Sequence, residues 1–88
     1  MSAERLSEMS QAQRDRLASI ELRERCLGEI RRQDLVTRFD IQSAAATRDI
    51  GQYKELAPGN IDYDPKGKVY VRGEWFRPIF DFPAERVL

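Results

Sequence analysis

The stretch from residue 28 to residue 57 reads GEIRRQDLVTRFDIQSAAATRDIGQYKELA and decides the fold. Apolar residues recur in it at helical spacing on both sides of a four-residue turn: Leu35, Val36, Phe39, Ile41 within the turn, and then Ala46, Ile50 and Tyr53. This spacing predicts two short helices joined by a turn, which is a helix-turn-helix. In that motif the first turn of the second helix faces outward, where it can enter the major groove of DNA.

The composition limits what the rest of the chain can be. The chain has 88 residues and a formal net charge of +0. A chain of this length forms one small domain, which buries only about 60% of the surface of its unfolded state. The neutral charge argues against an indiscriminate polyanion binder, so any affinity for DNA depends on where the charges lie. The one cysteine cannot form an internal disulfide and no signal core or membrane span is visible, so we expect a cytoplasmic protein.

A further helix is predicted over residues 11–27, which contain good helix formers and neither Gly nor Pro. Gly28 is its expected C-cap, and the polar residues 1–10 are expected to form a flexible arm. Its apolar residues fall into two stripes: Leu17, Ile20 and Leu27 on one side, and Ala18, Leu22 and Cys26 on the other. The second stripe needs a cover, which is either the C-terminal segment of the same chain or a partner subunit. Within it, Cys26 is interpreted as a small buried hydrophobe rather than a reactive thiol.

A β-hairpin is predicted after Pro58, which ends the second helix of the motif. Two runs rich in β-branched and aromatic residues, 61–63 and 69–71, flank Asp64-Pro65-Lys66-Gly67, which suits a type I or II turn. A hairpin in this place is a wing, and cations cluster on or near it: Lys66, Lys68, Arg72 and Arg77. Residues 11–73 are therefore expected to form an α+β winged helix-turn-helix, with three helices followed by a β-hairpin wing.

Residues 74–88 carry more apolar surface than such a domain needs. Between residues 75 and 83 the chain has five large apolar residues in nine, and residues 84–88 look like the start of another helix after Pro83. We expect this segment to connect the winged domain to a further domain downstream. Together with the second stripe of the first helix it gives the candidate interface residues, which are Leu22, Cys26, Phe76 and Phe80.

The candidate DNA-reading surface is the start of the second helix of the motif, with Gln42 as its N-cap. The positions that lie away from the apolar stripe are Ser43, Ala44, Thr47 and Arg48. Arg48 can make a bidentate contact with a guanine edge, and the Ala44 methyl can touch a thymine methyl. A hydroxyl of Ser43 or Thr47 can donate to a phosphate. The alternative for Arg48 is an ordinary solvated surface charge.

Contacts with the DNA backbone are expected from residues around that helix: Arg31, Arg32, Gln42, Lys66 and Lys68. Arg31 and Arg32 open the preceding helix, and a helix N-terminus favours phosphate. The alternative for these two is a role as ordinary surface arginines. Asp49 would be repelled by phosphate if it faced DNA, so we expect it to point sideways and to pair with a basic residue of the first or preceding helix.

An enzyme is not expected. The chain has no histidine, no Gly-rich phosphate loop and no ligand cluster with metal spacing, and its cysteine lies in an apolar stripe. The paired carboxylates Asp62 and Asp64 are interpreted as residues that flank the hairpin turn. We therefore expect no catalytic residue, no metal and no cofactor.

The chain also resembles a known family. The resemblance is carried by four motifs: Gly28-Glu29-Ile30-Arg31-Arg32 with Asp34-Leu35-Val36, Arg48-Asp49-Ile50 with Tyr53, Leu56-Ala57-Pro58 continuing to Tyr63-Asp64, and Phe76-x-Pro78-x-Phe80. These motifs are similar to the N-terminal winged helix-turn-helix domain of WYL-domain transcriptional repressors of the CapW and BrxR type, over about residues 11–88. Two positions depart from the family pattern. Asp40 stands where the turn usually has Gly, and Asp tolerates that left-handed conformation; Ala45 stands where Gln is common, which could change the operator that is read.

The resemblance implies a homodimeric repressor that binds an inverted repeat in the promoter of a bacterial anti-phage defence operon. It also implies a downstream WYL domain that senses a ligand such as a nucleic acid or a nucleotide. Two other classes stay open: a winged helix used for protein–protein or subunit contact, and an RNA-binding hairpin. Steeply salt-dependent binding to duplex DNA would separate a DNA reader from a protein-contact module.

Overall fold

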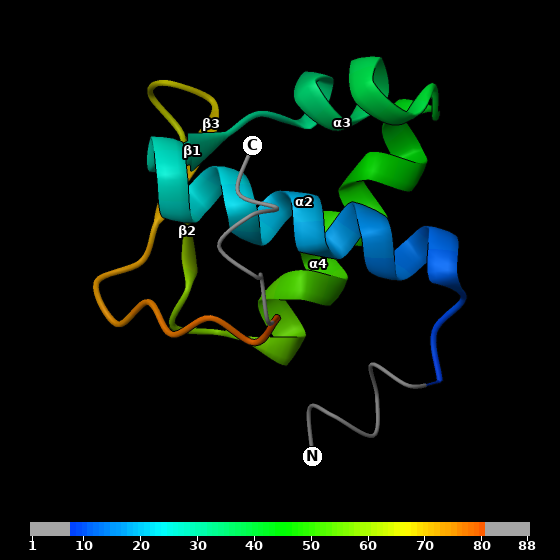
Figure 1. The fold of residues 1–88 in the computed structure, drawn as a ribbon. Helices are drawn as coiled ribbons and strands as arrows, with labels where there is room; N and C mark the ends of the chain where they lie inside the picture. The colour runs from blue at the N-terminus through cyan, green and yellow to red at the C-terminus, as the bar shows by residue number, and fades with distance from the viewer. Residues whose placement is uncertain (1–7, 81–88) are drawn as a thin grey trace.

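The computed structural model describes residues 8–80, in which three helices precede most of a small sheet (Figure 1). The helices are α2 (Gln11–Leu27), α3 (Arg32–Phe39) and α4 (Ser43–Leu56). The strands are β1 (Glu29–Ile30), β2 (Ile61–Asp64) and β3 (Val69–Arg72), and they form an antiparallel sheet in the order β1-β3-β2. The predicted α+β winged architecture is confirmed, and β1 is an addition that the sequence analysis did not include.

The ends of α2 follow from two residues. At the start, the Ser10 hydroxyl accepts a hydrogen bond from the backbone N–H of Gln13 at 3.1 Å, which satisfies one of the free donors of the first turn. At the end, Gly28 has φ 78° and its N–H donates to the carbonyls of Arg23 and Glu24. Because a side chain is strained at this φ, the glycine stops the helix, as predicted.

The turn between α3 and α4 depends on Asp40, which has φ 53° and ψ 50°. Asp is one of the few residues other than glycine that accept this left-handed conformation, so the missing family glycine does not break the turn. Gln42 is the extended N-cap residue of α4, and α4 ends at Leu56 just before Ala57-Pro58, both as predicted.

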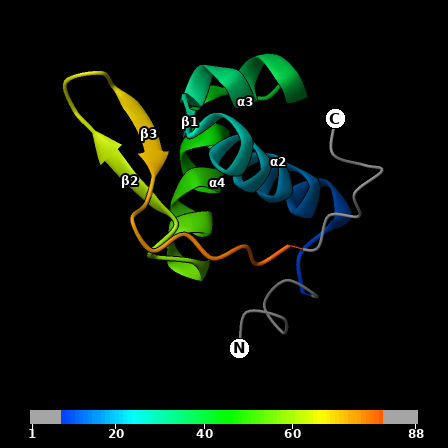
Figure 2. The same ribbon diagram turned by 60° about the vertical axis from the view of Figure 1, so that its left-hand side comes forward.

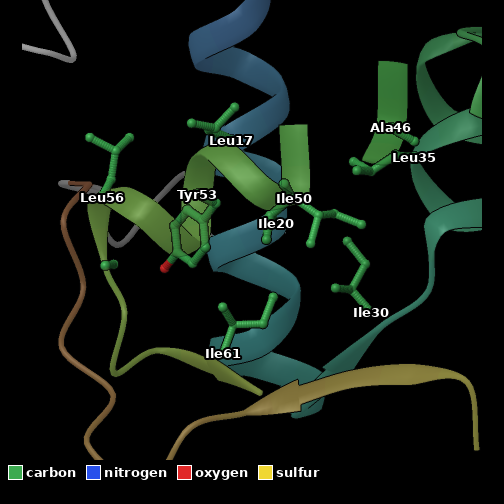
Figure 3. Packing of buried hydrophobic residues seen from close by; sticks show 10 residues of the cluster. Leu17, Ile20, Ile30, Leu35, Ala46, Ile50, Tyr53, Leu56 and Ile61 are labelled. Carbon is green, nitrogen blue, oxygen red and sulfur yellow. The ribbon is translucent and has the colours of Figure 1, made fainter. Parts of the chain in front are cut away.

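The hydrophobic core lies where α2, α4 and the sheet meet (Figure 3). Its fully buried members come from the three helices and from two of the strands: Leu17 and Ile20 from α2, Ile30 from β1, Leu35 from α3, Ala46 and Tyr53 from α4, and Ile61 from β2, which is 1% exposed. The predicted apolar stripes of α3 and α4 are therefore confirmed at these core positions. Burial of each large apolar side chain contributes about 1.5–3 kcal/mol, so this cluster is the main source of stability.

The wing projects to one side of the helices (Figure 2). In it Tyr63 pairs with Tyr70, and their ring centroids lie 4.8 Å apart. The loop at its tip covers residues 65–68 and ends with Lys68 at φ 52°. The predicted turn covered residues 64–67, so the loop extends one residue further, to Lys68. Strand β1 pairs with β3, with Ile30 opposite Tyr70, and this pairing attaches the wing to the helices.

Two positions of α2 differ from the predicted stripes. Cys26 is exposed and Leu27 is 63% exposed, so residues 8–80 bury neither of them. For Cys26 the physical reason is the path of residues 73–80, which contact α2 at Glu21 and thus more than a turn before Cys26. Ala18 and Leu22, which lie nearer to that contact, are half-buried.

Residues 73–80 turn back from the wing beneath the helices (Figures 1 and 2). The turn is tight at Gly73, whose N–H donates to the Asn60 carbonyl at 2.9 Å and where an added Cβ would lie 2.1 Å from the Gly59 carbonyl oxygen. Ile79 and Phe80 then pack against the core. The expected domain boundary at residue 73 stays a prediction. The expected arm before residue 8 and the expected helix over residues 84–88 lie outside the described residues.

Candidate nucleic-acid interface

The first two turns of α4 divide into a buried and an exposed face. Ala46, Asp49 and Ile50 are buried. The four residues predicted to read bases all lie on the exposed face: Ser43, Ala44, Thr47 and Arg48. Gln42, the predicted backbone contact at the N-cap, is also exposed. The structure thus brings the candidate base-reading residues together on one surface.

This surface combines small side chains with positive electrostatic character. Short side chains at positions 43–45 let the backbone of α4 approach another surface closely. The first turn of α4 contains no acidic residue, and the N-terminus of a helix carries about half a positive charge. Arg48 adds a full charge one turn later. Such a helix end suits a polyanionic groove.

Asp49 does not contribute to this surface, because it is buried in an ion pair with Arg16. Arg16 Nε lies 2.5 Å from Asp49 Oδ2, Arg16 Nη2 donates to Oδ1 at 3.4 Å, and Asp49 is 3% exposed. The predicted pairing with a basic residue of the first helix is therefore confirmed. It neutralises the one carboxylate adjacent to Arg48 and fastens α4 to α2.

The wing loop presents Lys66 and Lys68, both exposed. Asp64 shapes this loop, because its Oδ1 accepts the backbone N–H of Lys66 at 3.0 Å. The two lysines therefore flank Gly67 at the tip of the wing, which is the arrangement that the sequence predicted for a contact with the DNA backbone.

Arg31 and Arg32 are exposed but are held by other parts of the chain. Arg31 Nη1 donates to the Gly67 carbonyl at 2.9 Å, and Arg32 Nη1 donates to the Thr47 hydroxyl at 3.3 Å. The two arginines at the start of α3 thus reach the wing loop and α4 respectively. Sequence reasoning predicted their position and did not predict these bonds.

The comparison with known families agrees with this geometry. A family model described as the winged helix-turn-helix domain of the BrxR transcriptional regulator matches residues 12–84. The chain belongs to this family. The family that the sequence motifs resemble is thereby confirmed.

Curated relatives of this BrxR-family domain carry the name DNA-binding transcriptional repressor CapW. The protein from Stenotrophomonas maltophilia is 37% identical over 73 residues, which are 83% of this chain and 24% of the relative. The protein from Pseudomonas aeruginosa is 39% identical over 77 residues, 86% of this chain and 26% of the relative. One from Escherichia coli is 37% identical over 68 residues, 77% of this chain and 23% of the relative. The chain spans about a quarter of the length of these relatives, which are named as repressors and not as enzymes.

Sequence analysis missed the buried polar residues of the BrxR-family domain. Glu21 and Glu24 are both 0% exposed, and Asn60 is 2% exposed. The signal was present, since Leu17, Ile20, Glu21 and Glu24 follow the i, i+3, i+4, i+7 spacing of a core-facing stripe. The two glutamates occupy positions that face the core, where a carboxyl group must find donors or lose its charge.

Glu21 finds three donors. Its Oε1 accepts the Tyr53 hydroxyl at 2.9 Å and the Ile79 N–H at 2.7 Å, and its Oε2 accepts the Phe80 N–H at 2.8 Å. Burial raises the pKa of Tyr53, so its hydroxyl stays a donor. The network ties α2 and α4 to the segment that follows the wing.

Asn60 holds the same segment from the other side. Its Nδ2 donates to the Tyr53 hydroxyl at 3.0 Å and to the Arg77 carbonyl at 2.7 Å, and its Oδ1 accepts the Arg77 N–H at 2.7 Å. A buried amide with this many partners is well satisfied. The end of the wing is therefore fixed to the base of α4 by side chains as well as by backbone bonds.

Glu24 is different, because neither of its carboxyl oxygens has a hydrogen-bond partner among the described residues. Burial raises its pKa to about 8, Glu29 adds to the rise, and Arg72 and Arg23 oppose it. The group is therefore mostly protonated in the folded state at neutral pH.

Within residues 8–80 no group of three or more His, Cys, Asp or Glu side chains could hold a metal ion. Among the helices in the described part of the chain, none has the length and apolar character needed to cross a membrane.

Proposed function

We propose that this BrxR-family domain is the DNA-binding part of a transcriptional repressor and reads double-stranded DNA with α4 in the major groove. The observation that carries the proposal is the exposed start of α4, where small residues and Arg48 stand without a competing acid because Asp49 is paired with Arg16. The names of the curated relatives, which are DNA-binding transcriptional repressors, support the same function. The relatives are bacterial, and a bacterial protein that binds DNA as a repressor acts in the cytoplasm.

The roles of the individual side chains follow from their chemistry. Arg48 offers a bidentate contact to guanine, and the Ala44 methyl offers an apolar contact to thymine. The hydroxyls of Ser43 and Thr47 complete the predicted base-reading set. Backbone contacts are assigned to residues beside α4 and at the tip of the wing: Gln42, Arg32, Lys66 and Lys68. Arg31 is the remaining predicted backbone contact, and its bond to the Gly67 carbonyl offers it a second role.

We further propose a homodimer on an inverted-repeat operator, in a longer protein whose downstream part is a ligand-sensing WYL domain, controlling an anti-phage defence operon. The support is the family resemblance and the greater length of the relatives. The proposed dimer surface includes two residues of α2, the half-buried Leu22 and the exposed Cys26. It also includes the half-buried Phe76 and Phe80 of the segment that follows the wing.

Arg48→Ala is expected to weaken binding to a cognate duplex by about 1–3 kcal/mol and to relax the preference at one base pair per half-site, because a bidentate guanine contact is lost. Folding should be unaffected, since Arg48 is exposed. The measurement is selection from a pool of random duplexes with the wild-type domain and with the variant, followed by titration of the selected sequences. Arg14→Ala, an exposed arginine of α2, is the matched control. An unchanged preference at every base pair would show that Arg48 does not read bases.

A second candidate function is a winged helix that contacts protein. Trp75 is 73% exposed and Leu27 is 63% exposed, and the net charge of the whole chain is +0. A domain of this second kind would show no salt-dependent affinity for duplex DNA, whereas a domain that contacts phosphates loses affinity steeply as salt rises.

A further inference from the structure

The start of α3 lies between the two elements assigned to DNA. Arg31 reaches 36 residues along the chain to the Gly67 carbonyl of the wing loop, at 2.9 Å. Arg32 reaches 15 residues to the Thr47 hydroxyl of α4, at 3.3 Å. Adjacent side chains thus join α3 to the wing on one side and to the proposed recognition helix on the other.

Arg31 is itself anchored. Its backbone N–H donates to Asp34 Oδ2 at 2.7 Å, and the same oxygen lies 3.3 Å from Nη2 of Arg23 on α2. The Nη2 atom of Arg31 lies 3.9 Å from Glu29 Oε2 on β1. The backbone of Arg31 is therefore fixed to α3, and its guanidinium group lies beside the Glu29 carboxylate of β1 as well as the wing loop.

The acceptor on the wing is equally well placed. Gly67 stands between Lys66 and Lys68, so a bond to its carbonyl restrains the backbone that carries both lysines. The loop is tight here, because a Cβ on Gly67 would lie 3.1 Å from Val69 Cγ1 and 3.2 Å from Asp64 Oδ2. A bond to this carbonyl therefore restrains the backbone at the tip of the wing.

We propose that Arg31 is a positioning residue, which fixes the wing loop relative to α4 so that Lys66 and Lys68 reach the DNA backbone while α4 lies in the groove. Its contribution to binding passes through the two lysines rather than through a phosphate contact of its own. The proposal rests on the proposed function, because that function assigns Lys66 and Lys68 to the DNA backbone. The bond between Arg31 and Gly67 is a property of the free domain.

The first test is a double-mutant cycle on the 88-residue chain, with a duplex selected by the wild-type domain as the probe. Lys66→Gln with Lys68→Gln should lower the slope of log affinity against log salt concentration by roughly 2. Each phosphate contact releases about one counterion from the DNA, and the variant loses two such contacts. Arg31→Ala alone should weaken binding roughly threefold to tenfold, the effect of one hydrogen bond. In the lysine double variant the same Arg31→Ala change should alter Kd less than twofold and leave the salt slope as it is. Additive effects, with the slope lowered by about 1 more, would overturn the proposal in favour of a direct phosphate contact.

The second test needs no DNA. Backbone ¹⁵N relaxation of the free domain should show increased mobility at residues 66–68 in Arg31→Ala, and unchanged mobility there in Arg14→Ala. An Arg31→Ala variant with an unaltered wing loop would overturn the proposal even if the domain binds DNA. A domain that fails to bind any duplex but shows the loosened loop would contradict the proposed function and not the link between Arg31 and the wing.

Discussion

Glu21→Ala is expected to destabilise the domain by roughly 3–5 kcal/mol, a large part of the 5–15 kcal/mol that holds a small domain together. The substitution leaves three donors without their acceptor: the Tyr53 hydroxyl and the backbone N–H groups of Ile79 and Phe80. An unsatisfied buried donor costs about 1–3 kcal/mol, and the bonds of the two backbone N–H groups are only partly buried, so each of these groups costs about 1 kcal/mol, at the low end of that range. A cavity in the fully buried site adds to the loss.

The measurement is urea unfolding followed by circular dichroism. Glu21→Gln, which keeps one acceptor oxygen, should give an intermediate loss, and Tyr53→Phe should cost less because it removes a single hydroxyl. Glu74→Ala, at an exposed glutamate, is the control and should stay within about 0.5 kcal/mol of the wild type. A loss below about 1 kcal/mol in Glu21→Ala would show that the network does not hold residues 77–80 on the helices.

Glu24→Gln is expected to stabilise the domain at high pH and to change little at low pH. The pKa of Glu24 is raised from 4.5 to about 8 in the folded state, mainly by burial. A raised pKa means that folding favours the protonated form, so the contribution to stability is fully present below about pH 4.5 and is lost as the pH rises through about 8. The neutral amide cannot ionise and keeps its contribution at every pH, a difference on the order of a few kcal/mol above pH 8.

The charged groups around Glu24 change the size of this effect but not its direction, which burial sets. Glu29 on β1 raises its pKa, whereas Arg72 on β3 and Arg23 on α2 lower it without cancelling the effect of burial. The free energy of unfolding is measured from pH 4 to pH 9 for the wild type and for Glu24→Gln, with Glu74→Gln as the control. The free energies of unfolding of the wild type and of Glu24→Gln should diverge above about pH 5. Parallel curves over the whole range would mean that Glu24 ionises in the folded state without cost.

The elements predicted from the sequence are those set by local chemistry. Gly28, Asp40 and Pro58 mark helix ends because each restricts or permits a particular backbone conformation in its immediate neighbourhood. The apolar spacing of α4 fixes its buried face, and the exposure of Ser43 and Arg48 follows from the geometry of a helix. The exposed surface could therefore be predicted, and its contact with DNA stays a prediction.

What the sequence did not reveal depends on residues far apart in the chain. The two-residue strand β1 exists because it pairs with β3, about 40 residues later in the sequence, and no local pattern of that length indicates a strand. Cys26 is exposed because the C-terminal segment contacts α2 at Glu21 instead. Glu21 itself lies on a core-facing position, where an apolar residue is the usual expectation. Its spacing from Leu17 and Ile20 places it on the core-facing stripe, and the donors it meets in the fold explain why a carboxyl group can be buried there.

The central claim is that α4 and the wing together form the surface that binds DNA. The most direct test is a ¹⁵N NMR titration of the 88-residue chain with a duplex selected from a random pool. The largest chemical-shift changes are expected at residues 43–48 and 66–68. A duplex that binds while residues 43–48 keep their shifts, or the absence of binding to any duplex, would contradict the claim.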